Sequence, residues 1–298
     1  MPQRSCLYQE KISPKRTFNR RAHSSCRSVH NPAMARWNWK LASASALIYT
    51  LAFNLIFFIQ ELFLVLPKAF TPGLRPTLFH NNHSWDGDSP LVKLFQGTGA
   101  LATFVTASVC AMLLQRGWGR TSTSRLFLVW LAYNGFFQSL PQVVIGAFIP
   151  ANDVGMAMDY FGLGATAKTT AAIVAGIAMP LIAVALIRPL LSLAENPAEI
   201  GSGSARSGFI FRTATLPAVV AVALIIPFRV PRNWIEVAMV PVVVTCIGIV
   251  WMQCGAWLIR NVSATGDSRN MSVARLAGAV VVLLLVFQLV LRPGIPFY

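Results

Sequence analysis

Residues 41–66 read LASASALIYTLAFNLIFFIQELFLVL, and Pro67 follows them. The run is apolar almost throughout, and its main interruptions are Asn54, Gln60 and Glu61. About 20 consecutive apolar residues cross the hydrocarbon core of a bilayer as a helix. The stretch therefore predicts a membrane-spanning helix that ends near Pro67.

Further apolar runs extend this prediction along the chain. Predicted spans lie near 41–66, 91–114, 126–149, 165–187, 213–228, 237–259 and 273–291. Run 213–228 is short and contains Pro217 and Pro227, so a re-entrant segment and six spans are the alternative. Only 12% of the residues are charged, against about 25% in soluble domains. The predicted fold is an all-α integral membrane protein, a polytopic bundle of seven (or six) transmembrane helices over residues 34–298, with the lipid bilayer as its surroundings.

The formal net charge of +15 does not indicate nucleic-acid binding, because the cations lie in the first 40 positions and in short loops. Lys and Arg hold loops on the cytoplasmic side of a membrane. With the N-terminus inside, the inner cations are Arg36, Lys40, Arg116, Arg120, Arg125, Arg188, Arg206, Arg212, Arg260, Arg269 and Arg275. The outer cations are Lys68, Arg75, Lys93, Lys168, Arg229, Arg232 and Arg292. The bias predicts a cytoplasmic N-terminus and an outside C-terminus, and the compact loops favour a bacterial inner membrane.

Residues 1–33 are rich in Arg, Lys and Ser and hold almost no aliphatic residues. This composition cannot form a core and predicts a disordered basic extension. It has no apolar segment of the kind that a secretory signal contains. Two interpretations remain: an organelle transit segment, or translation that begins at Met34. We favour Met34, because a transit segment should also be amphipathic.

Polar side chains form a stripe on each of two predicted spans. Asn54, Glu61 and Lys68 are spaced by seven residues, nearly two helical turns, and Gln60 lies beside them. Asn134, Gln138 and Gln142 are spaced by four on the third span. Buried polar groups in a membrane are costly and mark functional sites by default. The two stripes therefore predict a polar cavity, formed by Asn54, Gln60, Glu61, Asn134, Gln138 and Gln142, that opens outward and carries a small solute or an ion.

The predicted outer loops contain the metal-ligand types. His80 and His83 precede Asp86 and Asp88, and the third outer loop contributes Asp153 and Asp159. Imidazole and carboxylate groups suit zinc, copper or iron. The second hypothesis is therefore a metal-dependent membrane enzyme with His80, His83, Asp86, Asp153 and Asp159 as candidate ligands. The alternative is that these histidines only stabilise a loop.

The pentapeptide Gln60-Glu61-Leu62-Phe63-Leu64 is similar to the H-E-x-x-H motif of site-2-type membrane metalloproteases. The glutamate matches, whereas Gln60 and Leu64 stand at both histidine positions. Asp153 or Asp159 would correspond to the later acidic ligand of that family. With two ligands missing, the resemblance implies an inactive relative, because the catalytic water could not be activated by zinc.

The sequence leaves open whether the protein is an enzyme. Transport ranks slightly ahead of metal-dependent catalysis, since the predicted buried polar groups outnumber the candidate ligands. A third hypothesis is an assembly or accessory protein that binds a membrane protein partner and whose polar stripes only hold helices together.

Overall fold

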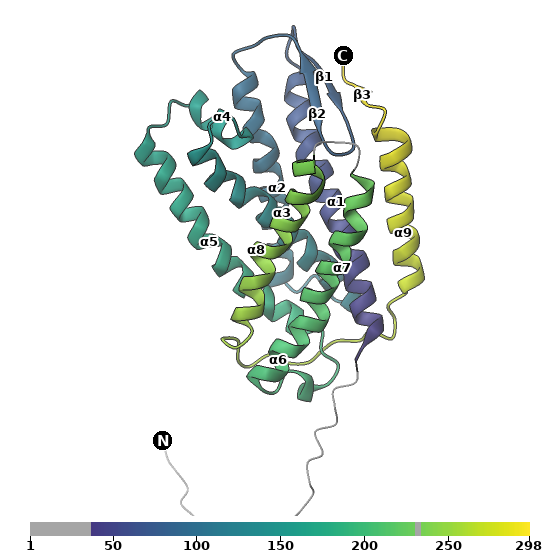
Figure 1. Ribbon diagram of the computed structural model, residues 1–298. Coiled ribbons are helices and arrows are strands. Elements are labelled where there is room, and N and C mark those ends of the chain that lie inside the picture. The colour runs from purple at the N-terminus through teal and green to yellow at the C-terminus, as the bar shows by residue number, and fades with distance from the viewer. Residues whose placement is uncertain (1–36, 230–233) are drawn as a thin grey trace, which may run out of the picture. The chain divides into compact units, whose positions relative to one another are not determined.

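The computed structural model describes residues 37–229 and 234–298. The predicted extension 1–33 and the alternative start at Met34 lie outside these residues. The described chain forms a bundle of long helices with a small β-sheet at one end (Figure 1). The predicted all-α polytopic membrane bundle is confirmed.

The long helices are α1 (Trp39–Ala69), α2 (Val92–Gln115), α3 (Ser122–Phe148), α5 (Ala165–Leu191), α7 (Leu216–Ile225), α8 (Val240–Gly255) and α9 (Val273–Val286). The short elements are β1 (Arg75–Leu78), β2 (His83–Asp86), β3 (Ile295–Pro296), α4 (Asp153–Tyr160), α6 (Gly203–Ile210), the 3-10 turns η1 (Pro197–Glu199) and η3 (Ile226–Phe228), and the π-helical turns η2 (Phe211–Thr215), η4 (Ile235–Met239) and η5 (Phe287–Leu291).

Six helical stretches of the described chain are long and apolar enough to cross a membrane. They are Trp39–Ala69, Val92–Gln115, Ala165–Leu191, Gly203–Phe228, Val237–Gly255 and Val273–Leu291. Helix α3 has 27 residues but is not among the six. Its polar stripe explains this, because the stripe lowers the hydropathy of α3 without shortening the helix.

Helix α3 lies inside the bundle, where its polar stripe is shielded from lipid. Trp130, Tyr133 and Phe137 on α3 are fully buried. Tyr49 on α1 meets Trp130 edge-on, with ring centroids 4.8 Å apart, and Tyr133 lies 4.7 Å from Phe137. Aromatic pairs in these arrangements add to the stabilisation from burial. These packed rings fill the middle of the bundle between α1 and α3.

The predicted span 213–228 begins ten residues too late. The helical stretch starts at Gly203 and continues through α6, η2 and α7 to Phe228. Its Ser- and Gly-rich first turns concealed it in the sequence. Pro217 has no N–H, so the carbonyl of Thr213 loses its usual α-helical donor. The hydroxyl of Ser45 on α1 donates to that carbonyl (2.6 Å).

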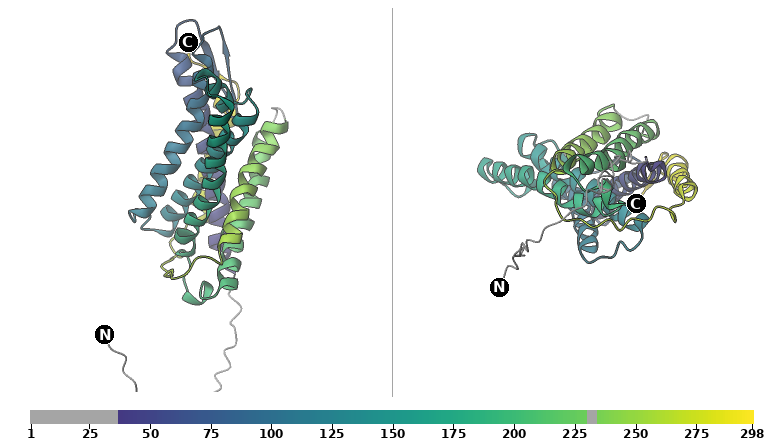
Figure 2. Two further views of the ribbon diagram at one scale, coloured as in Figure 1. Left: turned by 90° about the vertical axis from the view of Figure 1, so that its left-hand side faces the viewer. Right: turned by 90° about the horizontal axis from the view of Figure 1, so that it is seen from below.

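Part of the first predicted outer loop is an antiparallel β-hairpin. Strand β1 pairs with β2 on one side and with β3 on the other, and Leu78 faces His83 in the register. Gly87 has φ +95°, and a Cβ there would meet the carbonyl oxygen of Gly73 at 1.9 Å. We call this side of the bundle the hairpin end. The C-terminus also lies there, and α9 runs beside α1 (Figures 1 and 2).

Candidate functional site

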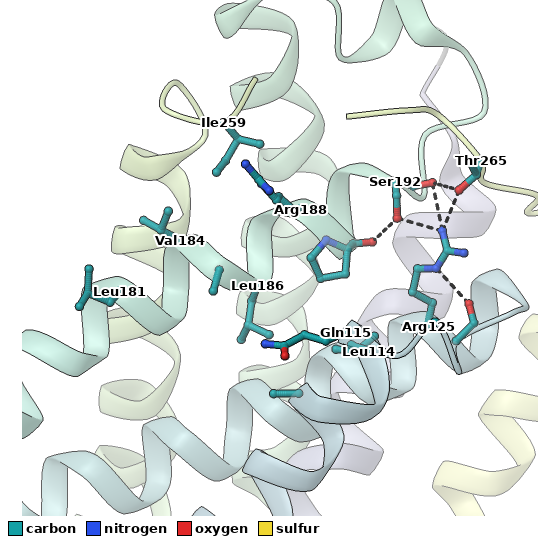
Figure 3. A pocket seen from close by; sticks show the side chains of 15 residues that line it. Leu114, Gln115, Arg125, Leu181, Val184, Leu186, Arg188, Ser192, Ile259 and Thr265 are labelled. Carbon is teal, nitrogen blue, oxygen red and sulfur yellow. Dashed lines mark hydrogen bonds between the residues drawn. The ribbon is translucent and has the colours of Figure 1, made fainter. Parts of the chain in front are cut away.

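Two large cavities lie near opposite ends of the bundle. One, of about 790 Å³, lies between α2, α3 and α5 at the end away from the hairpin (Figure 3). The other, of about 540 Å³, lies at the hairpin end and contains the predicted polar residues. We call the second one the polar cavity. Its polar lining residues are Gln60, Glu61, Asn81, Asn82, His83, Gln96, Gln138, Gln142, Asn152, Asp153 and Arg229.

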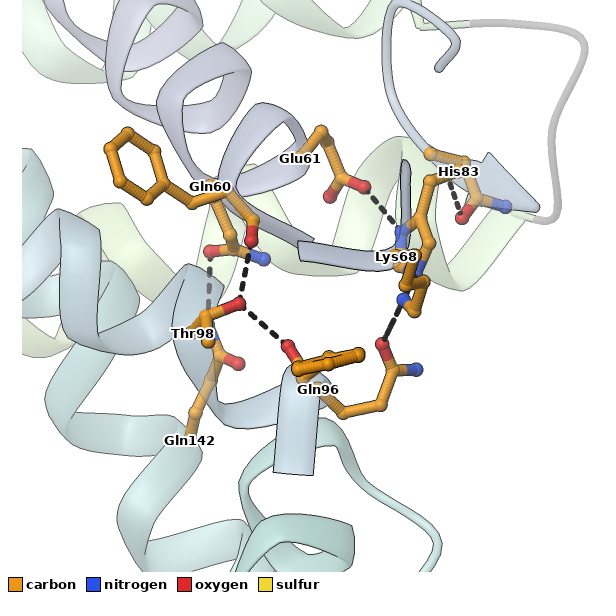
Figure 4. A network of polar contacts seen from close by, with 10 residues as sticks. Gln60, Glu61, Lys68, His83, Gln96, Thr98 and Gln142 are labelled. Carbon is orange, nitrogen blue, oxygen red and sulfur yellow. Dashed lines mark hydrogen bonds and ion pairs between the residues drawn. The ribbon is translucent and has the colours of Figure 1, made fainter. Parts of the chain in front are cut away.

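A chain of three ionisable side chains forms one wall of this region (Figure 4). The Oε2 atom of Glu61 lies 2.8 Å from Nδ1 of His83. The other ring nitrogen, Nε2, lies 3.0 Å from Nζ of Lys68. Helix α1 supplies Glu61 and Lys68, while the hairpin places His83 between them. Glu61 and Lys68 are only 4% and 0% exposed, and charges buried to this degree need such partners for compensation.

Gln96 on α2 completes the surroundings of Lys68. Its Oε1 lies 2.7 Å from Nζ of Lys68 and 3.2 Å from Nε2 of His83. The ammonium group also lies 4.4 Å from the centroid of the Trp85 ring, which stacks on His83. Asp153 and Glu61 both act on Lys68 electrostatically. The cation is therefore held by two hydrogen bonds and one cation–π contact, and it is balanced by two carboxylates.

The arrangement permits two positions for one proton. An ammonium group can only donate, so charged Lys68 requires Nε2 of His83 to accept and Nδ1 to donate to Glu61. When the proton moves from Nζ to Nε2, His83 becomes the cation and donates from both nitrogens. Gln96 Oε1 is within reach of either donor. The geometry therefore suits proton exchange between Lys68 and His83 beside Glu61.

Two glutamines join the stripes of α1 and α3. Gln142 Nε2 donates to Oε1 of Gln60 (3.0 Å) and to the carbonyl of Gln138 (2.8 Å). This contact places Gln142 beside Gln60, the neighbour of Glu61 on α1. Within the described chain, Gln138 Oε1 and Asn81 Oδ1 are buried and have no hydrogen-bond partner. Such oxygens cost about 1–3 kcal/mol each when unsatisfied, so a donor that reached them would stabilise the cavity wall.

Arg229 forms the opposite part of the wall. It is 2% exposed, and its guanidinium lies 4.1 Å from the centroid of the Phe57 ring. Its carbonyl accepts from Nδ2 of Asn81 (2.5 Å). A buried guanidinium on an aromatic face is a strong cation–π arrangement. Arg229 was counted from the sequence as a loop cation, yet it lines the cavity.

The structure places four of the six predicted cavity residues in the lining: Gln60, Glu61, Gln138 and Gln142. Asn54 and Asn134 are buried nearer the middle of the bundle, where each amide donates to a carbonyl of its own helix, Thr50 O (2.8 Å) and Trp130 O (2.9 Å). The two stripes thus contribute four residues to one cavity, and their other two members lie at least one helical turn deeper in the bundle.

The candidate metal ligands do not lie together at one site. No group of three or more His, Cys, Asp and Glu side chains in the described chain is placed to hold a metal ion. His83 is engaged by Glu61, Asp159 is paired with Lys168, and Asp86 is exposed. His80 is 3% exposed in the turn of the hairpin. Asp153 lies in the polar cavity with Glu61.

Several residues of the site were missed. Gln96 is a polar residue inside a predicted span, and the rule that identified Glu61 applies to it equally. Lys68 was recognised only as part of the stripe. Asn81 and Trp85 come from the hairpin and Arg229 from the end of η3, segments without helical periodicity, so only the fold brings them to the cavity.

Fold and site together define a polytopic membrane protein with a buried, charge-balanced polar cavity at one end. Comparison with known proteins found no matching family model, no similar curated protein and no similar solved structure.

Proposed function

We propose that the protein binds a small polar solute or an ion in the polar cavity and transports it across the membrane. One observation supports the proposal above all others. A cavity of about 540 Å³ is lined by Glu61 and His83, and these two residues are hydrogen-bonded in series with the buried Lys68. Pockets for small ligands commonly have about 300–1,000 Å³. Ionisable groups buried at membrane depth mark ion pathways and proton relays.

The empty volume favours transport over a purely structural role. Helices that are only locked together need paired polar groups, and Gln60 with Gln142 is such a pair. A role that only holds helices together needs no open cavity. It also does not need buried oxygens without a hydrogen-bond partner, such as those of Gln138 and Asn81 in the wall of the polar cavity. An occupant with N–H or O–H donors would satisfy these oxygens after a small rotation of either side chain.

We call Glu61, His83 and Lys68 the ion chain. In the proposed mechanism, the protonation of the ion chain changes when an occupant binds. One proton moves from Lys68 Nζ to His83 Nε2, and the Nδ1 proton of His83 passes to Glu61 Oε2. Both steps together leave Lys68, His83 and Glu61 neutral, without any change in the number of protons. A charged occupant beside Glu61 shifts this balance, so binding and protonation are coupled. From the cation bias we place the hairpin end outside a bacterial inner membrane.

An inactive relative of the site-2 metalloproteases is the second candidate. One observation favours it: Asp153, a candidate for the later acid, lines the same cavity as Glu61. Asp159, the other candidate acid, instead pairs with Lys168. Elemental mass spectrometry of the purified protein and of the double variant His80→Ala/His83→Ala tests the remaining candidate, a metal-dependent enzyme. Stoichiometric metal that disappears in the variant would favour that enzyme. Absence of metal after loading with zinc, copper and iron is expected of both the transporter and the inactive relative, and uptake then separates these two.

The test of transport begins with the purified protein in lipid nanodiscs. Melting temperature is measured with ammonium, alkali cations, amino acids, polyols and nucleobases, and uptake of any stabilising compound is followed in proteoliposomes. Glu61→Gln should abolish uptake while the protein stays folded, and Gln138→Leu should weaken binding. Gln115→Leu, an exposed glutamine far from the polar cavity, is the matched control.

Uptake by Glu61→Gln at the rate of the parent would contradict the proposal. An accessory role predicts another result: no compound binds, a membrane protein partner co-purifies, and substitutions in the stripes change abundance rather than flux.

A further inference from the structure

The larger cavity, of about 790 Å³, lies at the end away from the hairpin and combines apolar walls with two arginines (Figure 3). Leu114 on α2 and Leu181, Val184 and Leu186 on α5 form apolar walls. Leu181 is 65% exposed, so the cavity opens toward the outer surface of α5. In a membrane-spanning bundle that surface meets lipid chains.

Arg125 is fixed at the edge of this cavity. Its Nη1 donates to the hydroxyls of Ser192 (2.9 Å) and Thr265 (2.9 Å), and its Nε donates to the carbonyl of Gly119 (3.0 Å). These contacts join three loops and hold the guanidinium in place. No carboxylate pairs with it among the ion pairs of the described chain. Its charge therefore remains available to an anion.

Arg188 brings a second positive charge to the same cavity. It lies in the last turn of α5 and is exposed. Among the described residues its guanidinium has no hydrogen-bond or ion-pair partner. Arginine is suited to phosphate because its planar fork can donate two parallel hydrogen bonds. One arginine is thus pre-positioned and the other is free to move toward a ligand.

The surroundings add to the positive field. The described cations at this end are Lys40, Arg116, Arg120, Arg125, Arg188, Arg206, Arg212, Arg260, Arg269 and Arg275. The described acids there are Glu195, Glu199 and Asp267, and each is hydrogen-bonded within the loops. Trp118 and Trp257 are 68% and 57% exposed at the same end. Exposed tryptophans of this kind lie at the headgroup level of a membrane.

We infer that this cavity binds an anionic phospholipid. The phosphate lies between Arg125 and Arg188, and one acyl chain follows the apolar groove between α2 and α5. Basic pockets between transmembrane helices bind anionic headgroups in this manner. The apolar walls favour a lipid over a soluble phosphate, which would leave them uncovered. The inference does not rest on the proposed transport function, because the two cavities are separate.

Native mass spectrometry of the detergent-purified protein tests the lipid site. Phosphatidylglycerol and phosphatidylcholine with identical acyl chains are added at equal concentration. The protein should retain phosphatidylglycerol preferentially. Arg188→Gln should reduce its apparent affinity about fivefold, the effect of one cation near a membrane surface. Arg275→Gln is the matched control, because Arg275 is exposed at the same end but does not line the cavity.

A second variant leaves both charges in place. Ala185 lines the cavity on the exposed side of α5, so Ala185→Trp should fill the groove and displace the lipid without lowering the melting temperature. Three results would overturn the inference: equal retention of phosphatidylcholine, an equal loss in Arg275→Gln, or displacement of the lipid by inorganic phosphate or glycerol phosphate. The last result would assign the arginines to a soluble anion.

Discussion

Replacement of Glu61 by glutamine removes one negative charge from the buried ion chain and keeps the size of the side chain. Glutamine Oε1 can still accept from Nδ1 of His83, which lies 2.8 Å from the carboxylate. A hydrogen bond to a charged group contributes about 1.5–3 kcal/mol and a neutral one about 0.5–1.5 kcal/mol. The weaker bond alone therefore costs about 1 kcal/mol.

The larger cost comes from Lys68, which is 0% exposed and loses its neighbouring anion. Breaking a buried pair by removing one partner costs about 3–5 kcal/mol. Asp153, whose electrostatic effect on Lys68 is larger than that of Glu61, is still present, so we expect Glu61→Gln to lower the free energy of unfolding by less than this, about 1–3 kcal/mol. Lys68→Met should cost a similar amount, because it removes the contacts with His83, Gln96 and Trp85.

The double variant Glu61→Gln/Lys68→Met separates the ion chain from the effects of each side chain. Groups in one ion network show interaction energies of about 0.5–3 kcal/mol. The double variant should therefore be more stable than the sum of the single effects predicts, by at least about 1 kcal/mol. Equilibrium unfolding in mixed detergent micelles measures the cycle, and Asp86→Asn, at an exposed carboxylate of the hairpin, is the control. Additivity within about 0.5 kcal/mol would refute the chain.

Three further predictions concern close contacts between helices. The Thr98 hydroxyl donates to the carbonyl of Phe63 (2.6 Å), which has no helical donor because Pro67 lacks an N–H. Thr98→Val should lower the free energy of unfolding by about 1 kcal/mol, measured with denaturant. The same change should cost little in a Pro67→Ala background, because the alanine then supplies the helical donor. Gly99→Ala should lower the melting temperature, because the new Cβ would meet the side chain of Leu64 at 2.7 Å, while Gly176→Ala, with open space around it, should not. The buried Nε1–H of Trp130 donates to Oγ of Ser45 (3.0 Å), so Ser45→Ala leaves it without an acceptor. The free energy of unfolding should fall by about 1–3 kcal/mol. An equal fall in Ser108→Ala, at a partly exposed serine, would contradict this reasoning.

Hydropathy predicted the long elements because membrane spans differ from loops in composition over many residues. The predicted run 273–291 matches the helical stretch Val273–Leu291, and 91–114 differs from α2 by one residue at each end. The hairpin and α4 were not predicted as structured elements, since each is short and partly polar. The start at Gly203 was missed for the same reason.

The polar cavity was predictable only where its residues lie on regular helices. Spacings of four and seven residues place Glu61, Gln138 and Gln142 on the inward faces of their helices, whatever the conformation of the loops. The partner of Glu61 could not be predicted from spacing. His83 reaches it only because β2 folds back along the end of α1, a contact that depends on the register of a short hairpin.

The C-terminal segment connects the lipid-facing exterior to this site. Val65 on α1, Leu78 on β1, and Phe287 and Leu291 after α9 form one buried cluster. Strand β3 then pairs with β1, so both edges of β1 are occupied. Because β1 fixes the register of β2, the position of His83 depends on α9, which contributes no side chain to the lining of the polar cavity. The contact between His83 and Glu61 is thus linked, through the three-stranded sheet, to the packing of α9 against α1. Residues far from one another in the sequence, at the two ends of the described chain, together fix this part of the cavity wall.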